Sequence, residues 1–503
     1  MPKPLTSLIA AIGAFVLPIT CQDTCPEQAA TVSALHVCTI HRQSKISSVA
    51  DHKIGQYGLP LLSFEKLFKN QAVPANQMLT ITALSDPSST AVVRPNVDTL
   101  YSSVSYDVGA SNLELKVPEI EPDKYWSAAF YTAYGDNYLN LGALETSAAG
   151  KYLLTLGDSA SADGSIALDT SNSGYIGRII TPHPIGVLLI RTVLKSGEDM
   201  TAASATQESF TAMTVSRSHP LTGPALDATL FITASNTETE KVLTITARFT
   251  NTTFGTASLY ATLALAGLSN GVYQKPECVN LAEAASIANQ TVAAWPTLNS
   301  STIALSSNWT MIDPSSIGVY GDDYVARAYI GSHAYLALVV EESIYPEQPM
   351  SFTLAADEAY LVQFAGKPPL ENLGFWSLTM YNEEGYLVEN TIDRYVLGDR
   401  SNLTYPGGNL VYGSDSDEPF EILVQAREPP AIWTSNWLPS PVDQAAFDML
   451  LRFYAPAQAL QEGTYEYPLI TKIPAITNGS TVPETVTRCT SALSITNFLF
   501  RMF

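Results

Sequence analysis

The chain has 503 residues, of which 46% are hydrophobic and 15% are charged. This length and composition allow two or three domains with sizeable cores and exclude a largely disordered chain. The 26 basic and 48 acidic residues give a net charge of −22, and a chain this acidic is a poor partner for nucleic acid or an anionic membrane surface.

The N-terminus has the pattern of a secretory signal peptide. Lys3 precedes an uncharged apolar run from Leu5 to Ile19, which is shorter than a membrane-spanning helix requires. Cleavage after Cys21 would remove this segment. We therefore expect a secreted or secretory-pathway protein that has no membrane span after signal cleavage.

Cysteine content and glycosylation motifs agree with secretion. Four cysteines follow Cys21, and an even number in a secreted chain predicts two disulfides; three connectivities are open, and we favour Cys25–Cys38 with Cys278–Cys489. Several Asn-x-Ser/Thr triplets without proline mark surface positions that can accept glycans. These acceptors are Asn251, Asn289, Asn299, Asn308, Asn402 and Asn478.

The N-terminal half predicts one helix followed by many short strands. Apolar residues at helical spacing behind Pro60 predict a helix within residues 56–71. The strands expected next are residues 91–93, 100–108, 113–117, 125–134, 139–141, 151–156, 179–194 and 242–249. Residues 187–190 form a continuous apolar run that should be buried on both faces. Ala- and Leu-rich composition predicts helices at 257–267 and 281–295.

The C-terminal half predicts a second group of strands. A helical segment is expected at 320–344, before strands at 360–364, 374–381, 386–388, 420–425 and 447–454. Many short strands with turns between them favour β-sandwiches or barrels. We therefore divide the chain into a signal peptide (1–21), an N-terminal β domain with helical segments (22–295), a Ser/Asn/Thr-rich linker (296–319), a C-terminal β domain (320–480) and a tail (481–503).

One short stretch, residues 93–101, concentrates polar side chains at the entry to a strand. It contains Arg94, Asn96, Asp98 and Tyr101, and the proline after Arg94 keeps that residue out of the right-handed helical region. Polar groups on a loop held by a rigid sheet often carry function. Arg94 and Asp98 could instead form a structural ion pair, and residue chemistry alone leaves both interpretations open.

These residues also resemble a known domain. Residues 94–102, with 57–60 upstream and 177–192 downstream, resemble the domain of unknown function numbered twelve fifty-four. The C-terminal half resembles its usual partner, numbered twelve fourteen. The stretches that carry this second resemblance are 324–328, 375–381, 390, 394–395, 398–400, 436–439 and 451–454. The resemblance implies a mainly β fold of two tandem jelly-roll-like sandwiches with helical connecting segments and association as a homotrimer, but no shared activity.

The chain shows no sequence pattern for a metal or cofactor. The histidines lack the spacing of metal ligands, and the sequence has neither a phosphate-binding glycine loop nor a nucleophile elbow. We therefore expect no metal and no cofactor. Basic residues are few, so an arginine within a motif is a candidate for holding an oxygen-rich small molecule. The candidate catalytic residues are Asp98 and Tyr101, since either could move a proton. The candidate substrate-binding residues are Arg94, Asn96, Arg394, Arg400, Arg452 and Tyr454.

Two classes of function stay open. The first is a cofactor-free enzyme of the isomerase, dehydratase or cyclase type that acts on a small organic molecule, as in secondary metabolism. It predicts that Asp98, Arg394 and Tyr454 line one cavity. The second is a non-catalytic surface, assembly or ligand-binding protein, which predicts polar pairs scattered through both domains. A glycosidase would need two carboxylates about 5–10 Å apart.

Overall fold

The computed structural model describes residues 53–478 except 91–92, 158–163, 169–172, 195–198, 222, 236, 251–256 and 278. The predicted signal peptide, the four cysteines of the predicted disulfides, Asn251 and the tail at 481–503 lie outside the described residues. Among the described helices, none combines the length and apolar character needed to cross a membrane.

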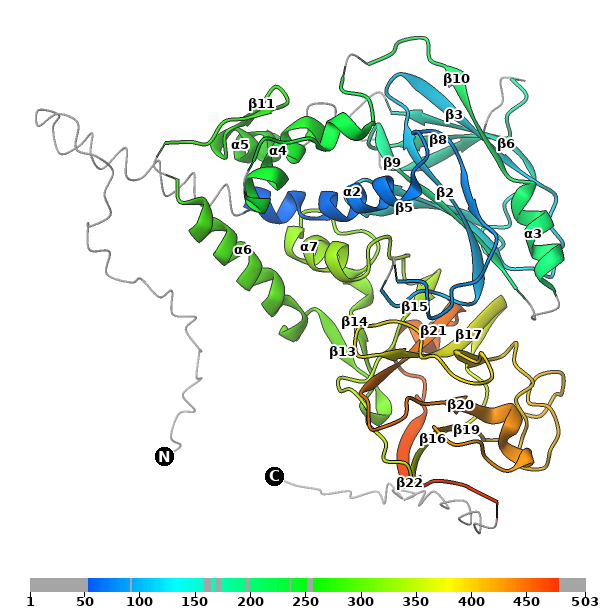
Figure 1. Cartoon of the computed structure of the whole chain (residues 1–503). Coiled ribbons are helices and arrows are strands. Elements are labelled where there is room, and N and C mark those ends of the chain that lie inside the picture. The colour runs from blue at the N-terminus through cyan, green and yellow to red at the C-terminus, as the bar shows by residue number, and fades with distance from the viewer. Residues whose placement is uncertain are drawn as a thin grey trace, which may run out of the picture.

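Two five-stranded sheets form the N-terminal sandwich (Figure 1). The first sheet has the order β1 (Leu79–Ile81), β2 (Thr99–Asp107), β9 (Ile185–Val193), β4 (Trp126–Thr132) and β5 (Asn137–Gly142). The second has the order β10 (Thr211–Ser216), β3 (Ser111–Val117), β6 (Gly150–Leu156), β8 (Gly177–Thr181) and β7 (Ser165–Leu168). Val104, Tyr106 and Leu188 of the first sheet pack against Leu115 and Leu154 of the second. Burying each such side chain contributes about 1.5–3 kcal/mol.

Helices cover the other face of the first sheet. They are α2 (Pro60–Gln71), α4 (Glu238–Thr250), α5 (Ala257–Leu265), α6 (Leu281–Ala294) and α7 (Tyr324–His333), while α3 (Met200–Glu208) lies at the opposite edge (Figure 1). Pro60 occupies the first turn of α2, as predicted. The side chain of Gln71 bonds the hydroxyls of Ser103 and Ser105 at 2.9 and 2.6 Å, so this polar face of β2 is buried as well.

Some predicted elements differ in the structure. Residues 386–388 form only an isolated bridge between Leu387 and Tyr381, and the helical segment expected at 320–344 is limited to α7, Tyr324–His333.

A predicted strand is also wrong. Residues 242–249 lie inside α4, not in a strand. The run is rich in β-branched residues, which favour strands. Val242, Ile245 and Phe249 nevertheless share a helical face and are buried, and Ile245 and Phe249 lie in the core that joins the helices to the first sheet. Tertiary packing therefore overrides local propensity here.

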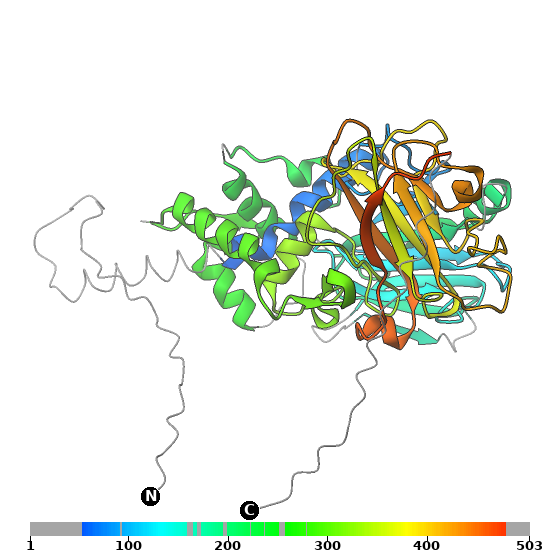
Figure 2. The same ribbon diagram turned by 90° about the horizontal axis from the view of Figure 1, so that it is seen from below.

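A second sandwich of two four-stranded sheets forms the C-terminal half. One sheet has the order β15 (Ser343–Ile344), β21 (Phe447–Pro456), β17 (Leu370–Asn382) and β18 (Val396–Gly398). The other has the order β20 (Trp437–Pro439), β19 (Phe420–Gln425), β16 (Glu358–Phe364) and β22 (Leu469–Pro474). The mainly β prediction is confirmed. Viewed from below, this sandwich lies over the N-terminal sheets and the helices gather on one side (Figure 2).

The stretch 296–319 is more than a connection. It holds a hairpin of β13 (Thr302–Ala304) and β14 (Thr310–Ile312). Trp309, which is 0% exposed, packs in the core of the C-terminal sandwich, and its indole N–H donates to the carbonyl of Pro468 at 2.8 Å. This stretch is therefore an ordered part of that sandwich.

Candidate inter-domain ligand site

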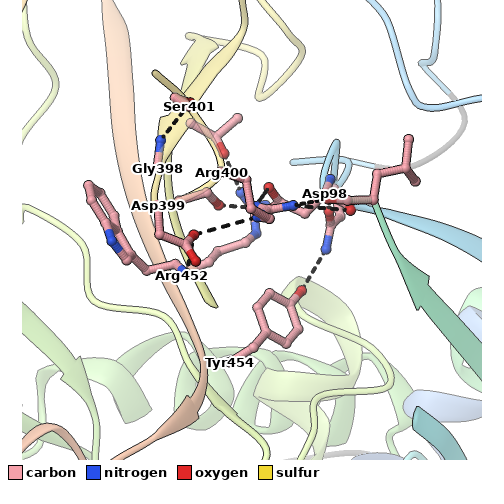
Figure 3. Close-up of polar contacts among 12 residues, drawn as sticks. Asp98, Gly398, Asp399, Arg400, Ser401, Arg452 and Tyr454 are labelled. Carbon is pink, nitrogen blue, oxygen red and sulfur yellow. Dashed lines mark hydrogen bonds and ion pairs between the residues drawn. The ribbon is translucent and has the colours of Figure 1, made fainter. Parts of the chain in front are cut away.

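Asp98 joins the two sandwiches (Figure 3). Its side chain is 2% exposed, and Ser377 on β17 donates to its Oδ2 at 2.7 Å. The guanidinium of Arg400 forms an ion pair with Oδ1 and donates to the main-chain oxygens of Asp98 and Leu194 at 3.3 and 3.1 Å. Both carboxylate oxygens therefore face the C-terminal sandwich, and Asp98 does not pair with Arg94.

A second carboxylate supports this clasp. Asp399 Oδ1 lies 3.5 Å from Nε of Arg400 and accepts the main-chain N–H of Trp376 at 3.0 Å. Burial raises the pKa of Asp399. Burial works against the charge on Arg400, but Asp98 and then Asp399 raise its pKa above the usual value. We call Asp98, Ser377, Asp399 and Arg400 the inter-domain clasp, because their hydrogen bonds and ion pairs with one another join the two sandwiches.

Arg94 holds the loop in front of the clasp. It has a positive φ of 51°, which is strained for a residue that is not glycine. Its main-chain N–H donates to Gly385 at 2.7 Å, and its guanidinium pairs with Glu347 at 2.6 Å beside a shallow pocket of about 240 Å³. Arg452 donates to the Arg94 carbonyl at 3.0 Å and to Thr379 at 2.9 Å. These contacts hold the motif against β17 and β21.

The remaining predicted binding residues separate into two places. Asn96 donates to the hydroxyl of Tyr454 at 2.5 Å, so both lie at the domain interface. Arg394 instead donates to the carbonyls of Thr434 and Trp437 at 2.5 and 2.9 Å. Its hydrogen bonds therefore join parts of the C-terminal half and do not bring it to Asp98 or Tyr454. The described contacts thus do not meet the prediction that Asp98, Arg394 and Tyr454 line one cavity.

A buried arginine that was not among the predicted site residues lies at the same interface. Arg191 on β9 is 5% exposed and lies in register between Tyr101 on β2 and Ser127 on β4. Its Nε and Nη1 are buried and have no hydrogen-bond partner among the described residues, and no described carboxylate forms an ion pair with it. The guanidinium carbon lies 5.7 Å from the centre of the Tyr101 ring.

Phenol groups from both sandwiches act on the charge of Arg191. They belong to Tyr101, Tyr131, Tyr345 and Tyr454. Burial works against the charge on Arg191, but these phenols keep its pKa well above the usual value, so the side chain stays cationic. Burial raises the pKa of Tyr131 to about 12, against the opposing effect of the neighbouring Arg191, and its buried hydroxyl makes no well-aligned hydrogen bond among the described residues.

A buried carboxyl group completes this cluster. Glu342, which is 2% exposed, accepts a hydrogen bond from the Tyr125 hydroxyl on Oε2 at 2.9 Å, and its carboxyl group also interacts with the side chain of Glu145. Burial and then Glu145 raise the pKa of Glu342 to about 9, against opposing effects of Tyr125 and Arg191. Glu342 is therefore protonated at neutral pH.

Aromatic rings form the wall between these polar groups. The Tyr125 ring lies 5.2 Å from Phe375 and 5.9 Å from Tyr454, centre to centre, and Phe375 stacks on Tyr454 at 4.3 Å. The guanidinium of Arg400, which belongs to the clasp, lies over the Phe375 ring, 4.5 Å from the ring centre.

The sequence carries one signal for this cluster. Arg191 directly follows the apolar run 187–190, and a lone cation in a strand buried on both faces needs a reason. Glu342 has no comparable signal, because it follows another glutamate in an irregular segment. Within the described part of the chain, no three His, Cys, Asp or Glu side chains group as metal ligands.

Comparisons with known proteins identify the two domains. The model "Protein of unknown function (DUF1254)" matches residues 75–214, and "Protein of unknown function (DUF1214)" matches 347–458. No curated protein matches the sequence. The crystal structure of the VPA0106 protein from Vibrio parahaemolyticus is similar, with 16% identity and a TM-score of 0.58, over 85% of this chain and 99% of that one.

That likeness shows a shared fold. A putative uncharacterized protein from Burkholderia cenocepacia has 11% identity and a TM-score of 0.41, over 88% of this chain and 98% of that one. The two domain matches occur in the predicted order in one chain. The chain therefore belongs to the family that pairs DUF1254 with DUF1214.

Proposed function

We propose that the protein binds a small organic acid at the Arg191 cluster and acts on it as a cofactor-free enzyme of the isomerase, dehydratase or cyclase type. The observation that carries this proposal is the buried guanidinium with unused donors on Nε and Nη1. A ligand carboxylate or enolate would supply the missing acceptor oxygens.

The other buried arginines of the interface make the contrast clear. Arg400 has Asp98, and Arg452 has Thr379 and the Arg94 carbonyl. Arg327 also has a buried Nε without a partner among the described residues, but its Nη2 pairs with Asp136 at 3.2 Å. A buried charge without such partners costs several kcal/mol. Arg191 therefore leaves a binding capacity that the described residues do not use.

The position of the cluster also favours a ligand. Arg191 and Ser127 come from the N-terminal sheet, whereas Phe375 and Tyr454 come from the C-terminal sandwich. Ligand sites commonly lie between domains and combine apolar walls with a few polar groups. Asp98, by contrast, has both oxygens engaged in the clasp, so we assign it a structural role.

A thermal-shift and calorimetric screen tests the proposal. The full chain is mixed with a panel of aliphatic and aromatic carboxylic acids and with their uncharged amides. We expect at least one acid, and not its amide, to raise the melting temperature. Arg191→Met should abolish this effect, while the exposed control Arg427→Met should retain it. Equal stabilisation of the Arg191→Met variant would contradict the proposal, and so would the lack of any binding acid.

We also propose that the protein is a glycoprotein of the secretory pathway. The five acceptors that the structure describes, Asn289, Asn299, Asn308, Asn402 and Asn478, are all exposed, as glycan attachment requires. Enzymatic removal of N-glycans from protein made in a eukaryotic host should lower its mass, and an unchanged mass would contradict this. Association as a homotrimer stays a prediction, which light scattering can test.

A further inference from the structure

We propose that Glu342 is the acid–base group of the Arg191 cluster and that the cluster takes a 2-oxo or 3-oxo carboxylic acid, or its enol. This inference rests on the proposed function and names its substrate class. It depends on how Glu342, Tyr125 and Arg191 are arranged across the domain interface.

The geometry gives the two oxygens of Glu342 different roles. Oε2 accepts the Tyr125 hydroxyl at 2.9 Å, which fixes the carboxyl group and would stabilise it after loss of its proton. Oε1 is buried, and the Glu342 carboxyl group also interacts with Glu145 through a side-chain hydrogen bond, so the proton that is transferred lies between these two carboxyl groups. Tyr125 is itself buried against the Phe375 and Tyr454 rings, which excludes water from this side.

The charges around Glu342 suit an enolisation. Arg191 is a permanent cation that can stabilise the negative charge of an enolate. Glu342 keeps its proton at neutral pH because burial and Glu145 raise its pKa to about 9. Glu342 can therefore give a proton to the carbon of the enolate, or take one from the oxo acid, while Arg191 holds the negative charge of the enolate.

The resulting reaction balances without another reactant. Glu342 first passes its proton to solvent through Glu145. Its carboxylate then removes a proton from the carbon beside the carbonyl: the C–H electron pair forms the carbon–carbon double bond, and the carbonyl π pair moves to the oxygen, where Arg191 holds the enolate charge. Glu342 ends protonated, as it began. The reverse steps return the oxo acid with a solvent hydrogen on that carbon.

Exchange with solvent has a route in the structure. Glu145 is exposed, follows β5, and acts on Glu342 strongly enough to raise its pKa. Its Oε2 lies over Gly142, where a Cβ atom would meet it at 2.9 Å, so the side chain folds back along the sheet. Glu145 can therefore pass solvent protons to the buried carboxyl group.

Deuterium exchange tests this inference. The full-length protein is incubated in D2O with pyruvate, 2-oxobutanoate, phenylpyruvate or acetoacetate, and loss of the proton signals beside the carbonyl is followed by NMR. We expect the wild-type protein to accelerate exchange of at least one acid that it binds. Glu342→Gln should lower this rate at least about tenfold while binding remains, since a positioned acid–base group contributes about 10²–10⁴-fold.

Matched variants separate the outcomes. The exposed control Glu371→Gln should exchange at the wild-type rate, and Arg191→Met should lose binding and exchange together. Unchanged exchange in Glu342→Gln would overturn the inference, and so would a bound oxo acid that the wild-type protein does not exchange. If the wild-type protein binds other carboxylic acids but no oxo acid, the substrate class is wrong and the proposed function survives. If it binds no acid at all, both proposals fail.

Discussion

Arg191 and Tyr101 lie opposite each other on β9 and β2, with the guanidinium carbon 5.7 Å from the centre of the phenol ring. This pair connects the polar motif at residues 93–101 to the buried cluster between the sandwiches. Tyr101 is therefore at the proposed ligand site, whereas Asp98, three residues earlier in the motif, closes the domain interface. The motif can contribute both to the ligand site and to the domain contact, because Tyr101 lies on β2 whereas Asp98 lies in the loop before it. Alternate residues of a strand point to opposite faces of the sheet.

Replacing Arg191 separates a binding role from a structural one. Arg191→Met removes a buried charge that has no described counter-ion, so we expect the ligand-free protein to gain about 1–4 kcal/mol in free energy of unfolding. Urea denaturation measures this change. The matched control is Arg327→Met, which leaves the half-buried Asp136 carboxylate without its cation and should lower stability by up to about 3 kcal/mol. A loss of similar size in Arg191→Met would show that Arg191 stabilises the fold instead.

Breaking the inter-domain clasp should lower stability without removing the ligand site. Arg400→Met leaves the buried Asp98 carboxylate with only Ser377, and we expect a loss of about 3–5 kcal/mol. In the double variant Asp98→Asn/Arg400→Met, the loss should be smaller than the sum of the two single losses, because the two residues interact directly. Additive losses would argue against the pair. Acid binding at Arg191 should persist in every variant that stays folded.

The pKa of Glu342 predicts a pH dependence of stability. Folded Glu342 keeps its proton up to about pH 9, whereas the unfolded chain releases it near the ordinary value of 4.5. Between these values the unfolded state binds fewer protons, so this group makes stability fall as the pH rises, by up to about 1.4 kcal/mol per pH unit. The effect levels off above pH 9.

Denaturation of the wild-type protein and Glu342→Gln over this pH range measures the contribution. The variant lacks the titrating group, so its stability relative to the wild-type protein should increase steadily with pH. Parallel curves for the two proteins would mean that Glu342 is ionised in the folded state, and its role as a proton donor would then be wrong.

The packing of Trp309 predicts that the stretch 296–319 is needed for stability. Trp309→Ala removes a fully buried indole and its bond to Pro468, so we expect a loss of about 3–5 kcal/mol in urea denaturation. The nearby exposed residue Asn299 gives a control, since Asn299→Ala should change stability by less than about 0.5 kcal/mol. Equal stability of both variants would return this stretch to the role of a simple linker.

The fold could be predicted in outline because several strands have a recognisable local pattern of apolar and polar residues. The alternation at residues 100–108 and the apolar run at 187–190 correspond to β2 and β9, and Pro60 marks the first turn of α2. The failure at residues 242–249 has a physical cause, since β-branched residues favour strands unless a helical face is buried. Local pattern does not contain that information.

The candidate site could be predicted only in part. The motif at residues 93–101, predicted as a functional loop, lies at the domain interface, where Tyr101 lies beside Arg191 and Asn96 bonds to Tyr454. The pairing of Asp98 with Ser377 and Arg400, however, joins residues from opposite halves of the chain, and no spacing rule predicts it. Glu342 becomes notable only through its burial, which depends on the packing of both sandwiches.

A structure of the full chain crystallised with the acid that stabilises it best tests most directly whether Arg191 binds the ligand. We predict density for that acid at the Arg191 cluster, with a carboxylate or carbonyl oxygen about 2.7–3.2 Å from Nε or Nη1 of Arg191. Density for the acid only elsewhere, with both nitrogens bonded to ordered water or to a side chain of the protein, would contradict the claim that Arg191 binds the ligand.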